Sequence, residues 1–204
     1  MGDHLPRDIA RRIRLVLFDV DGVMTDGGLY MGQAPDGGVV ELKRFDITDG
    51  LGVKMLVWAG LEVALVSGRE SAASRVRAAE LEVECFEDAG ARKIPLVERL
   101  LARHGASWAE AAFVADDLAD LPVLRRVGLP VAVANAVPEV RAAARWVTRR
   151  PGGHGAVREF AETLLRARGD WSRLVDEYCR ARGEDSAAPS GKGTAPRAGE
   201  ATDG

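Results

Sequence analysis

Several features are scarce in this sequence of 204 residues, and each absence excludes a class of function. No apolar run approaches the ~18 residues that a membrane-spanning helix needs. The stretch from Met1 to Arg7 lacks the apolar segment of a signal peptide. Cysteine occurs only twice, at Cys85 and Cys179, without the spacing of a metal site. We therefore expect a protein of the reducing cytoplasm.

Positive charge is not in excess either, because the formal net charge is −3. Such a chain has no basic field to attract nucleic acid or an anionic membrane, so we expect neither as a partner. The glycine-rich loops Gly-x-Gly-x-x-Gly and Gly-x4-Gly-Lys-Ser/Thr, typical of nucleotide-binding proteins, are also missing. The composition, 47% hydrophobic and 29% charged, is that of a soluble globular protein with room for one sizeable core.

Short apolar runs alternate with helical patterns along the chain. The predicted strands are Ile13–Val20, Val63–Ser67, Val83–Phe86, Ala111–Ala115, Val131–Ala134 and Trp146–Thr148. The predicted helices lie near Asp49–Ala59, Glu70–Leu81, Ala91–His104, Leu118–Val127, Pro138–Ala144 and Ala156–Arg168. This alternation indicates βαβ units, so we expect a three-layer, doubly wound parallel sheet of the Rossmann-like α/β class.

One segment interrupts the alternation, between residues 27 and 45. Two short strands flank the turn Pro35-Asp36-Gly37-Gly38, which predicts an inserted β-hairpin. An isolated hairpin is marginal in water, so we expect it to pack on the body or on another subunit. From about Gly183 to Gly204 there is no large apolar residue, which predicts a disordered tail after a single domain of residues 1–182.

Two aspartates, Asp19 and Asp21, follow the first strand and are separated by one residue. Carboxylates this close raise each other's pKa and attract a cation, an arrangement that stability alone does not require. The pair therefore predicts a site in which one carboxylate attacks, the other moves a proton and a divalent metal holds both ionised. A solvated turn at the end of a strand is the simpler alternative.

Polar side chains also follow three further strands. They are Ser67-Gly68-Arg69 after the second strand, Lys93 (with Arg92 beside it) after the third, and Asp116, Asp117 and Asp120 after the fourth. Because ligands bind beyond the carboxyl ends of parallel strands, we expect these residues to converge with Asp19 and Asp21. Taken singly, each has a structural alternative, such as a helix N-cap for serine or aspartate and a solvated surface position for lysine.

Together, these residue types suit phosphoryl transfer through a covalent aspartyl phosphate. A carboxylate nucleophile can approach a phosphate dianion only if their repulsion is neutralised. Mg²⁺, which prefers oxygen ligands, can bridge carboxylates and a phosphate oxygen. The hydroxyl of Ser67, the approachable N–H of Gly68 and the cation of Lys93 suit the phosphate, while Asp116 completes the metal shell.

The motifs Asp-x-Asp-Gly-Val-x-Thr-Asp, Ser-Gly-Arg, a lone lysine and Asp-Asp-x-x-Asp, in this order, resemble the haloacid dehalogenase superfamily of phosphatases over residues 13–165. The closer resemblance, in residues 18–27, 45–52 and 152–159, is to the 3-deoxy-D-manno-octulosonate 8-phosphate phosphatases. It implies a Mg²⁺-dependent homotetramer of lipopolysaccharide sugar biosynthesis. It also implies a hairpin in place of a cap domain, with neighbouring chains helping to close each site.

The resemblance implies a role for each matched residue. Asp19 is implied to be the nucleophile and a metal ligand, and Asp21 the general acid and base that also lends its backbone carbonyl to Mg²⁺. Asp116 is implied to be a further metal ligand, with Asp117 supporting a metal-bound water and Asp120 supporting the loop. Phosphate binding is implied for Ser67, Gly68 and Lys93. Sugar binding is implied for Arg69 and His154.

Two residues depart from the family pattern, namely Ala115 where glycine is usual and His154 where arginine is frequent. We expect the extra methyl group of Ala115 to be tolerated, whereas loss of a permanent cation at His154 weakens binding of a sugar carboxylate. The alternatives are therefore a nonulosonate 9-phosphate phosphatase, a small-phosphoester generalist, or a catalytically silent tetramerisation module. Retention of the catalytic residues argues against the last.

Overall fold

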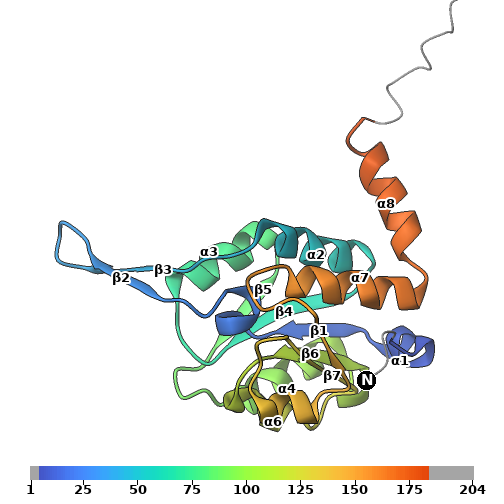
Figure 1. Cartoon of the computed structure of the whole chain (residues 1–204), viewed down its shortest axis with the longest axis horizontal. Coiled ribbons are helices and arrows are strands. Elements are labelled where there is room, and N and C mark those ends of the chain that lie inside the picture. Colours follow the sequence, from blue (N-terminus) through green and yellow to red (C-terminus); the bar gives the residue numbers. More distant parts are fainter. Residues whose placement is uncertain (1–4, 184–204) are drawn as a thin grey trace, which may run out of the picture.

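The computed structural model describes residues 5–183, and it forms an α/β fold around one sheet (Figure 1). The strands are β1 (Leu15–Phe18), β2 (Tyr30–Gln33), β3 (Val39–Leu42), β4 (Glu62–Ser67), β5 (Glu84–Glu87), β6 (Ala111–Ala115), β7 (Leu129–Ala132) and β8 (Trp146–Val147). The helices are α1 (Arg7–Arg12), α2 (Ile47–Trp58), α3 (Ala72–Leu81), α4 (Lys93–His104), α5 (Leu121–Leu124), α6 (Pro138–Ala143), α7 (Ala156–Arg168) and α8 (Trp171–Arg180). The tail predicted from about residue 183 lies, apart from Gly183, outside the described residues.

The main sheet is parallel and follows the order β5-β4-β1-β6-β7-β8, which confirms the doubly wound arrangement. Strand β1 lies inside the sheet, and all four of its residues are buried because helices cover both faces. Phe18 is aligned with Leu65 of β4 on one side and with Val114 of β6 on the other. The carboxyl ends of these three strands are therefore level with one another.

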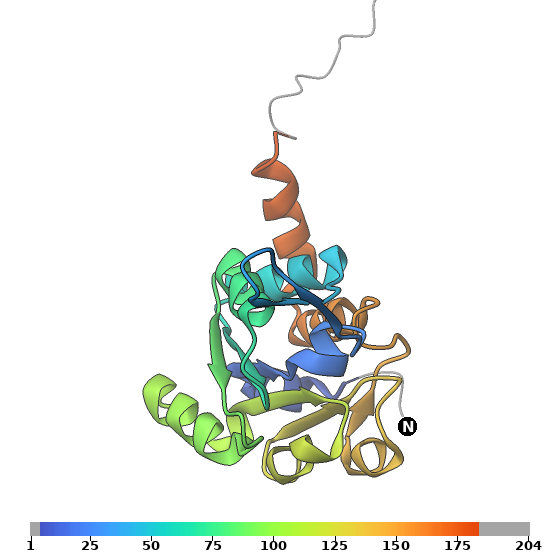
Figure 2. The ribbon, with the colours of Figure 1, turned by 90° about the vertical axis from the view of Figure 1, so that its left-hand side faces the viewer.

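Helices form a layer on each side of this sheet, as Figures 1 and 2 show. Helices α2, α3 and α7 lie on one face, and α4, α5 and α6 on the other. Phe160 of α7 packs edge-on against Phe18 of β1, with ring centroids 6.0 Å apart, and both rings are fully buried. No helix among residues 5–183 combines the length and the apolar character needed to cross a bilayer.

The helix boundaries differ from the sequence predictions in three places. Helices α1 and α8 were not predicted; α8 projects from the body in Figures 1 and 2. The single helix predicted for residues 118–127 is wrong, because a 3₁₀ turn at Leu118–Asp120 precedes the short helix α5. Asp117 caps that turn, and Pro122 occupies the first turn of α5, where the missing N–H of proline is tolerated.

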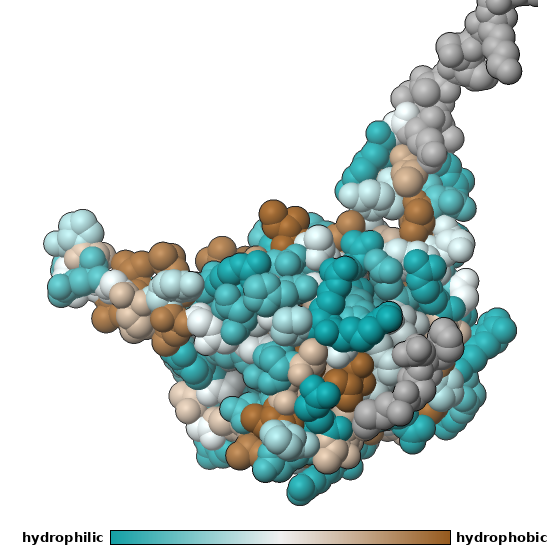
Figure 3. Space-filling view, viewed as in Figure 1, coloured by the Kyte–Doolittle hydropathy of each residue, from teal (hydrophilic) through white to brown (hydrophobic). Residues whose placement is uncertain are grey.

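The predicted hairpin is confirmed as the antiparallel pair β2–β3, inserted between β1 and α2 with no cap domain beside it. Gly37 has φ +85° at the turn, a conformation that favours glycine. The hairpin projects from the body and carries exposed apolar side chains, which Figure 3 shows as a brown region. The most exposed of them are Tyr30, Met31, Val39 and Leu42.

Helix α7 is attached to α2 through Asp49, a fully buried residue. Its carboxylate accepts N–H bonds from Gly155 (3.2 Å) and Arg158 (2.8 Å) at the start of α7. Burial raises the pKa of Asp49 to about 6, so the group is ionised at neutral pH and suits this helix N-terminus. Asp46, rather than Asp49, caps α2 by accepting from the N–H of Thr48.

Replacement of Asp49 by alanine leaves two buried N–H groups without an acceptor. We expect Asp49→Ala to lower the free energy of unfolding by about 1–3 kcal/mol. Denaturant unfolding at neutral pH measures the change. Asp8→Ala, which removes a carboxylate from the exposed surface of α1, is the control and is expected to leave stability unchanged. Equal stability of the Asp49 variant and the wild type would contradict this role.

Candidate active site

Asp19 directly follows the last residue of β1, beside the carboxyl ends of β4 and β6. Its backbone N–H donates to the carbonyl of Val114 in β6 at 3.1 Å, which extends the strand pairing by one residue. The side chain is only 8% exposed. A carboxylate held this deep requires partners of opposite charge.

Lys93, the first residue of α4, supplies that charge. Its ammonium group contacts the carboxylate of Asp19 and lies 2.5 Å from Oδ1 of Asp120. Burial alone lowers the pKa of Lys93, but these two carboxylates raise it above its usual range. Lys93 is thus the cation of the site, whereas Arg92 is exposed and pairs with Asp88 at the surface.

Asp116 is the third carboxylate near this lysine. Ligand atoms of Asp19, Asp116 and Asp120 all lie within 4.8 Å of one another. Burial, together with the charges of Asp19 and Asp120, raises the pKa of Asp116 to about 8. Its Oδ1 is buried and has no hydrogen-bond partner among residues 5–183. A divalent cation satisfies both conditions, because it supplies the missing partner and the missing positive charge, so these residues fit Mg²⁺.

Gly22 gives Asp116 the space to approach. The turn Val20–Met24 that follows Asp19 contains Gly22 at φ +91°. A Cβ atom at Gly22 would lie 2.0 Å from Oδ2 of Asp116. Thr25, which is fully buried, holds the turn by accepting from the N–H of Gly22 and donating to the carbonyl of Val20, each at 3.2 Å.

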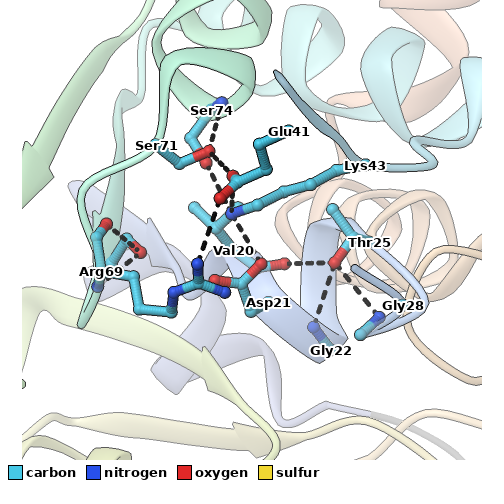
Figure 4. A network of polar contacts seen from close by, with 12 residues as sticks. Val20, Asp21, Gly22, Thr25, Gly28, Glu41, Lys43, Arg69, Ser71 and Ser74 are labelled. Atoms are coloured by element: carbon cyan, nitrogen blue, oxygen red, sulfur yellow. Dashed lines mark hydrogen bonds and ion pairs between the residues drawn. The ribbon is translucent and has the colours of Figure 1, made fainter. Parts of the chain in front are cut away.

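The side chain of Asp21 lies apart from the carboxylate cluster. It pairs with Lys43, whose Nζ is 2.7 Å from Oδ1 of Asp21, and it keeps 31% of its side-chain area exposed. The carboxylate cluster consists of Asp19, Asp116 and Asp120, so the side chain of Asp21 is not part of it. Figure 4 shows the half-buried carboxylate of Asp21 directed toward the ammonium group of Lys43.

The Ser67-Gly68-Arg69 segment ends β4 as expected. The hydroxyl of Ser67 donates to the carbonyl of Arg69 at 2.9 Å and accepts from the N–H of the same residue at 3.1 Å. Gly68 lies against α4, since a Cβ there would be 3.7 Å from Cε of Lys93. The guanidinium of Arg69 lies 3.1 Å from Glu41 of the hairpin and is about half exposed. The segment therefore borders the lysine on one side and the hairpin on the other.

The glycine-rich loop before α7 covers the turn that contains Gly22. A Cβ at Gly152 would lie 1.7 Å from the carbonyl oxygen of Gly22, so only glycine fits. His154 is exposed, and its Nδ1 lies 3.4 Å from Nη1 of Arg44, which also donates to the carbonyl of Gly153 at 2.5 Å. Arg44 thus supplies a permanent cation beside His154.

Three residues near the site were missed in the sequence. Asn135 accepts from the N–H of Gly152 (2.7 Å) and donates to the carbonyl of Gly22 (3.3 Å), which joins the loop to the turn. Its position just after β7 follows the same strand-end rule and could have identified it. Lys43 and Arg44 come from the hairpin, where no local pattern indicates a site.

Two predicted residues have local contacts as well. Asp117 is exposed, and its Oδ1 accepts from the N–H of Leu118 at 2.7 Å, which is the capping role. Ala115 is fully buried in β6, so its methyl group is accommodated in the core. Asp120 accepts from the N–H of Asp116 at 3.3 Å, in agreement with a supporting position for the loop.

This fold, with carboxylates and a lysine at the ends of adjacent parallel strands, defines a haloacid dehalogenase-like hydrolase. The family model of that description matches residues 81–160. The 3-deoxy-D-manno-octulosonate 8-phosphate phosphatase of Escherichia coli strain K12 is 40% identical over 160 residues, which cover 78% of this chain and 83% of the relative. The chain belongs to the family of these phosphatases.

Solved structures agree with this assignment. The 3-deoxy-D-manno-octulosonate 8-phosphate phosphatase of Yersinia pestis is 39% identical with a TM-score of 0.75, covering 81% of this chain and 88% of that one. The enzyme of the same name from Moraxella catarrhalis, determined with magnesium, phosphate and KDO, is 31% identical with a TM-score of 0.78, covering 84% and 97%.

The excess of carboxylates over cations in this cluster predicts a conflict between stability and metal binding. We expect Asp116→Asn to raise the free energy of unfolding of the metal-free protein at neutral pH by about 1–4 kcal/mol, because the buried carboxyl group must take up a proton on folding whereas asparagine need not. The same variant is expected to lose the stabilisation that Mg²⁺ gives the wild type. Thermal unfolding with and without Mg²⁺ measures both effects. An undiminished Mg²⁺ response in the variant would exclude Asp116 as a ligand.

Proposed function

We propose that this protein is a Mg²⁺-dependent phosphatase that hydrolyses 3-deoxy-D-manno-octulosonate 8-phosphate to the free sugar acid and inorganic phosphate, a step of lipopolysaccharide sugar biosynthesis. The observation that carries the proposal is the buried contact of Asp19 with Lys93, close to Asp116, in a chain 40% identical to phosphatases of that specificity. Residues 1–182 then form one catalytic domain. The free, half-buried Cys85 and Cys179 suit a cytoplasmic location.

Asp19 acts as the nucleophile. Its carboxylate oxygen forms a bond to phosphorus while the bond between phosphorus and the sugar oxygen breaks, and Asp21 gives its proton to that leaving oxygen. Asp21 then removes a proton from water, which attacks phosphorus and breaks the bond to Asp19. Inorganic phosphate leaves, and both carboxylates return to their starting state.

The carboxylate of Asp19 and the phosphate of the substrate are both anions, so nearby positive charge is needed to reduce their repulsion. Lys93 contacts Asp19 and lies where a transferring phosphoryl group can share its charge. Asp19, Asp116 and the backbone carbonyl of Asp21 would hold Mg²⁺, which supplies Lewis-acid stabilisation of phosphate oxygens when bound. Ser67 and Gly68 would complete the phosphate site from the end of β4, and Asp117 and Asp120 would support its loop.

The rim of the site suits a sugar acid. Arg69 and Arg44 are about half exposed, and His154 lies beside Arg44. A guanidinium binds a carboxylate through two parallel hydrogen bonds. Arg44 thereby offsets the cation missing at position 154, which supports an acidic sugar as the substrate.

A substrate panel tests both the reaction and its specificity. We expect release of phosphate from 3-deoxy-D-manno-octulosonate 8-phosphate to exceed that from nine-carbon keto-sugar phosphates, and a chelator to abolish it. Preference for a nine-carbon substrate would favour a nonulosonate phosphatase. No turnover on any sugar phosphate would leave an assembly module as the explanation.

Asp19→Asn tests the nucleophile. We expect kcat to fall by at least about 10⁴-fold, the loss typical when an enzyme loses its nucleophile, with little change in thermal stability. Asp176→Asn, on the exposed surface of α8, is the matched control and is expected to retain full activity. Retained turnover in the Asp19 variant would refute the covalent mechanism.

We further propose that the protein is a homotetramer assembled through its hairpins. Support comes from the hairpin itself, because two isolated strands are marginally stable in water and these expose Tyr30, Met31, Val39 and Leu42. Burial of such side chains contributes about 1.5–3 kcal/mol each.

Val39→Glu places a charge on this apolar surface. We expect it to weaken association by at least about tenfold, since a buried unpaired carboxylate is costly. Analytical ultracentrifugation measures the change. Val76→Glu, at a similarly exposed valine of α3, is the control and is expected to leave the mass unchanged. A monomeric wild type, or a tetrameric Val39→Glu variant, would contradict the proposal.

A further inference from the structure

The hairpin contributes two charged side chains to the polar network drawn in Figure 4. Glu41 lies in β3, and Lys43 follows two residues later, just past the end of the strand. Residues two apart in extended chain share one face, so both side chains reach the body of the protein. Leu42, between them, is 61% exposed and lies on the other face.

Lys43 is held at its nitrogen by three oxygen atoms. Nζ lies 2.7 Å from Oδ1 of Asp21, 3.2 Å from Oγ of Ser74 and 3.6 Å from Oε1 of Glu41. The oxygens of Asp21 and Ser74 lie within hydrogen-bond distance of this ammonium group, and Glu41 adds a longer ion pair. The side chain has no exposed area, so its position is set by these contacts rather than by solvent.

Glu41 fixes the other end of the network. One carboxylate oxygen accepts from the hydroxyl of Ser71 at 2.5 Å, and the other lies 3.1 Å from the guanidinium of Arg69. Ser71 caps α3, and its hydroxyl also accepts from the N–H of Ser74 at 3.3 Å. These contacts fix strand β3 to the first turn of α3 and so restrict the position of the Lys43 backbone.

We propose that Lys43 is a positioning residue for the general acid, and that it holds Oδ1 of Asp21 so that the other oxygen carries the proton to the leaving group. The inference rests on the proposed function, in which Asp21 is that acid. Lys43 approaches from the hairpin side, whereas Lys93 contacts Asp19 within the carboxylate cluster. The two lysines thus serve the two catalytic aspartates separately.

A comparison of leaving groups separates this role from a general loss of structure. An alkoxide leaves poorly unless it is protonated, whereas a nitrophenolate leaves without an acid. The value of kcat/KM reports the steps up to the first irreversible transfer, which includes protonation of the leaving oxygen. We therefore compare kcat/KM for the sugar phosphate and for p-nitrophenyl phosphate.

Lys43→Met is expected to lower kcat/KM for the sugar phosphate by about 10- to 100-fold and for p-nitrophenyl phosphate by less than about threefold, since general acid catalysis acts only on the first. Lys43→Arg keeps a cation and is expected to restore most of the wild-type ratio of kcat/KM for the sugar phosphate to kcat/KM for p-nitrophenyl phosphate. Lys54→Met, a lysine of α2, is the matched control and is expected to match the wild type. Equal losses on both substrates, or no loss on either, would overturn the proposal.

Ser74→Ala provides a second test that keeps both charges, in case Lys43→Met does not fold. It removes the hydroxyl of Ser74, which accepts a hydrogen bond from Lys43. We expect the ratio of kcat/KM for the sugar phosphate to kcat/KM for p-nitrophenyl phosphate to fall by about two- to tenfold, the effect of one hydrogen bond. An unchanged ratio would overturn the proposal. A wild type inactive on both substrates would instead refute the phosphatase function, so the two failures are distinguishable.

Discussion

The buried contact of Lys93 with Asp19 and Asp120 is the interaction on which the rest of the site depends. Three carboxylates, including Asp116, face one ammonium group in surroundings that exclude most water. Burial, followed by the charge of Asp19, raises the pKa of both Asp116 and Asp120. Charge is thus concentrated beyond what stability favours, and a divalent cation is what relieves it.

Strand order makes this concentration of charge feasible. Because β1 lies between β4 and β6, Asp19 is flanked by the Ser67 turn on one side and by Asp116 on the other. Two glycines also allow the loops around the site to approach one another closely. Gly22 leaves room for the carboxylate of Asp116, and Gly152 lets the last loop rest on the carbonyl of Gly22. Any side chain at these two positions would push the loops apart.

Much of this arrangement could be predicted, because parallel strands have one polarity and their polar ends must meet. Lys93 was identified by its place after a strand, and its burial separates it from Arg92. The partners of Asp21 could not be predicted, since Lys43 arrives from a hairpin whose packing depends on tertiary contacts with α3. Helix α8 was missed although Trp171, Leu174, Val175 and Tyr178 recur at helical spacing, a pattern that predicts an amphipathic helix.

The hairpin therefore combines two tasks on opposite faces of one short strand. Its outer face exposes Val40 and Leu42, while its inner face ties Glu41 to α3 and brings Lys43 to Asp21. A two-stranded ribbon has little stability of its own, so contacts on either face restrict its position. Packing on the outer face would then stabilise the backbone that holds Lys43. In the proposed mechanism, assembly and proton transfer would thus be linked through the rigidity of β3.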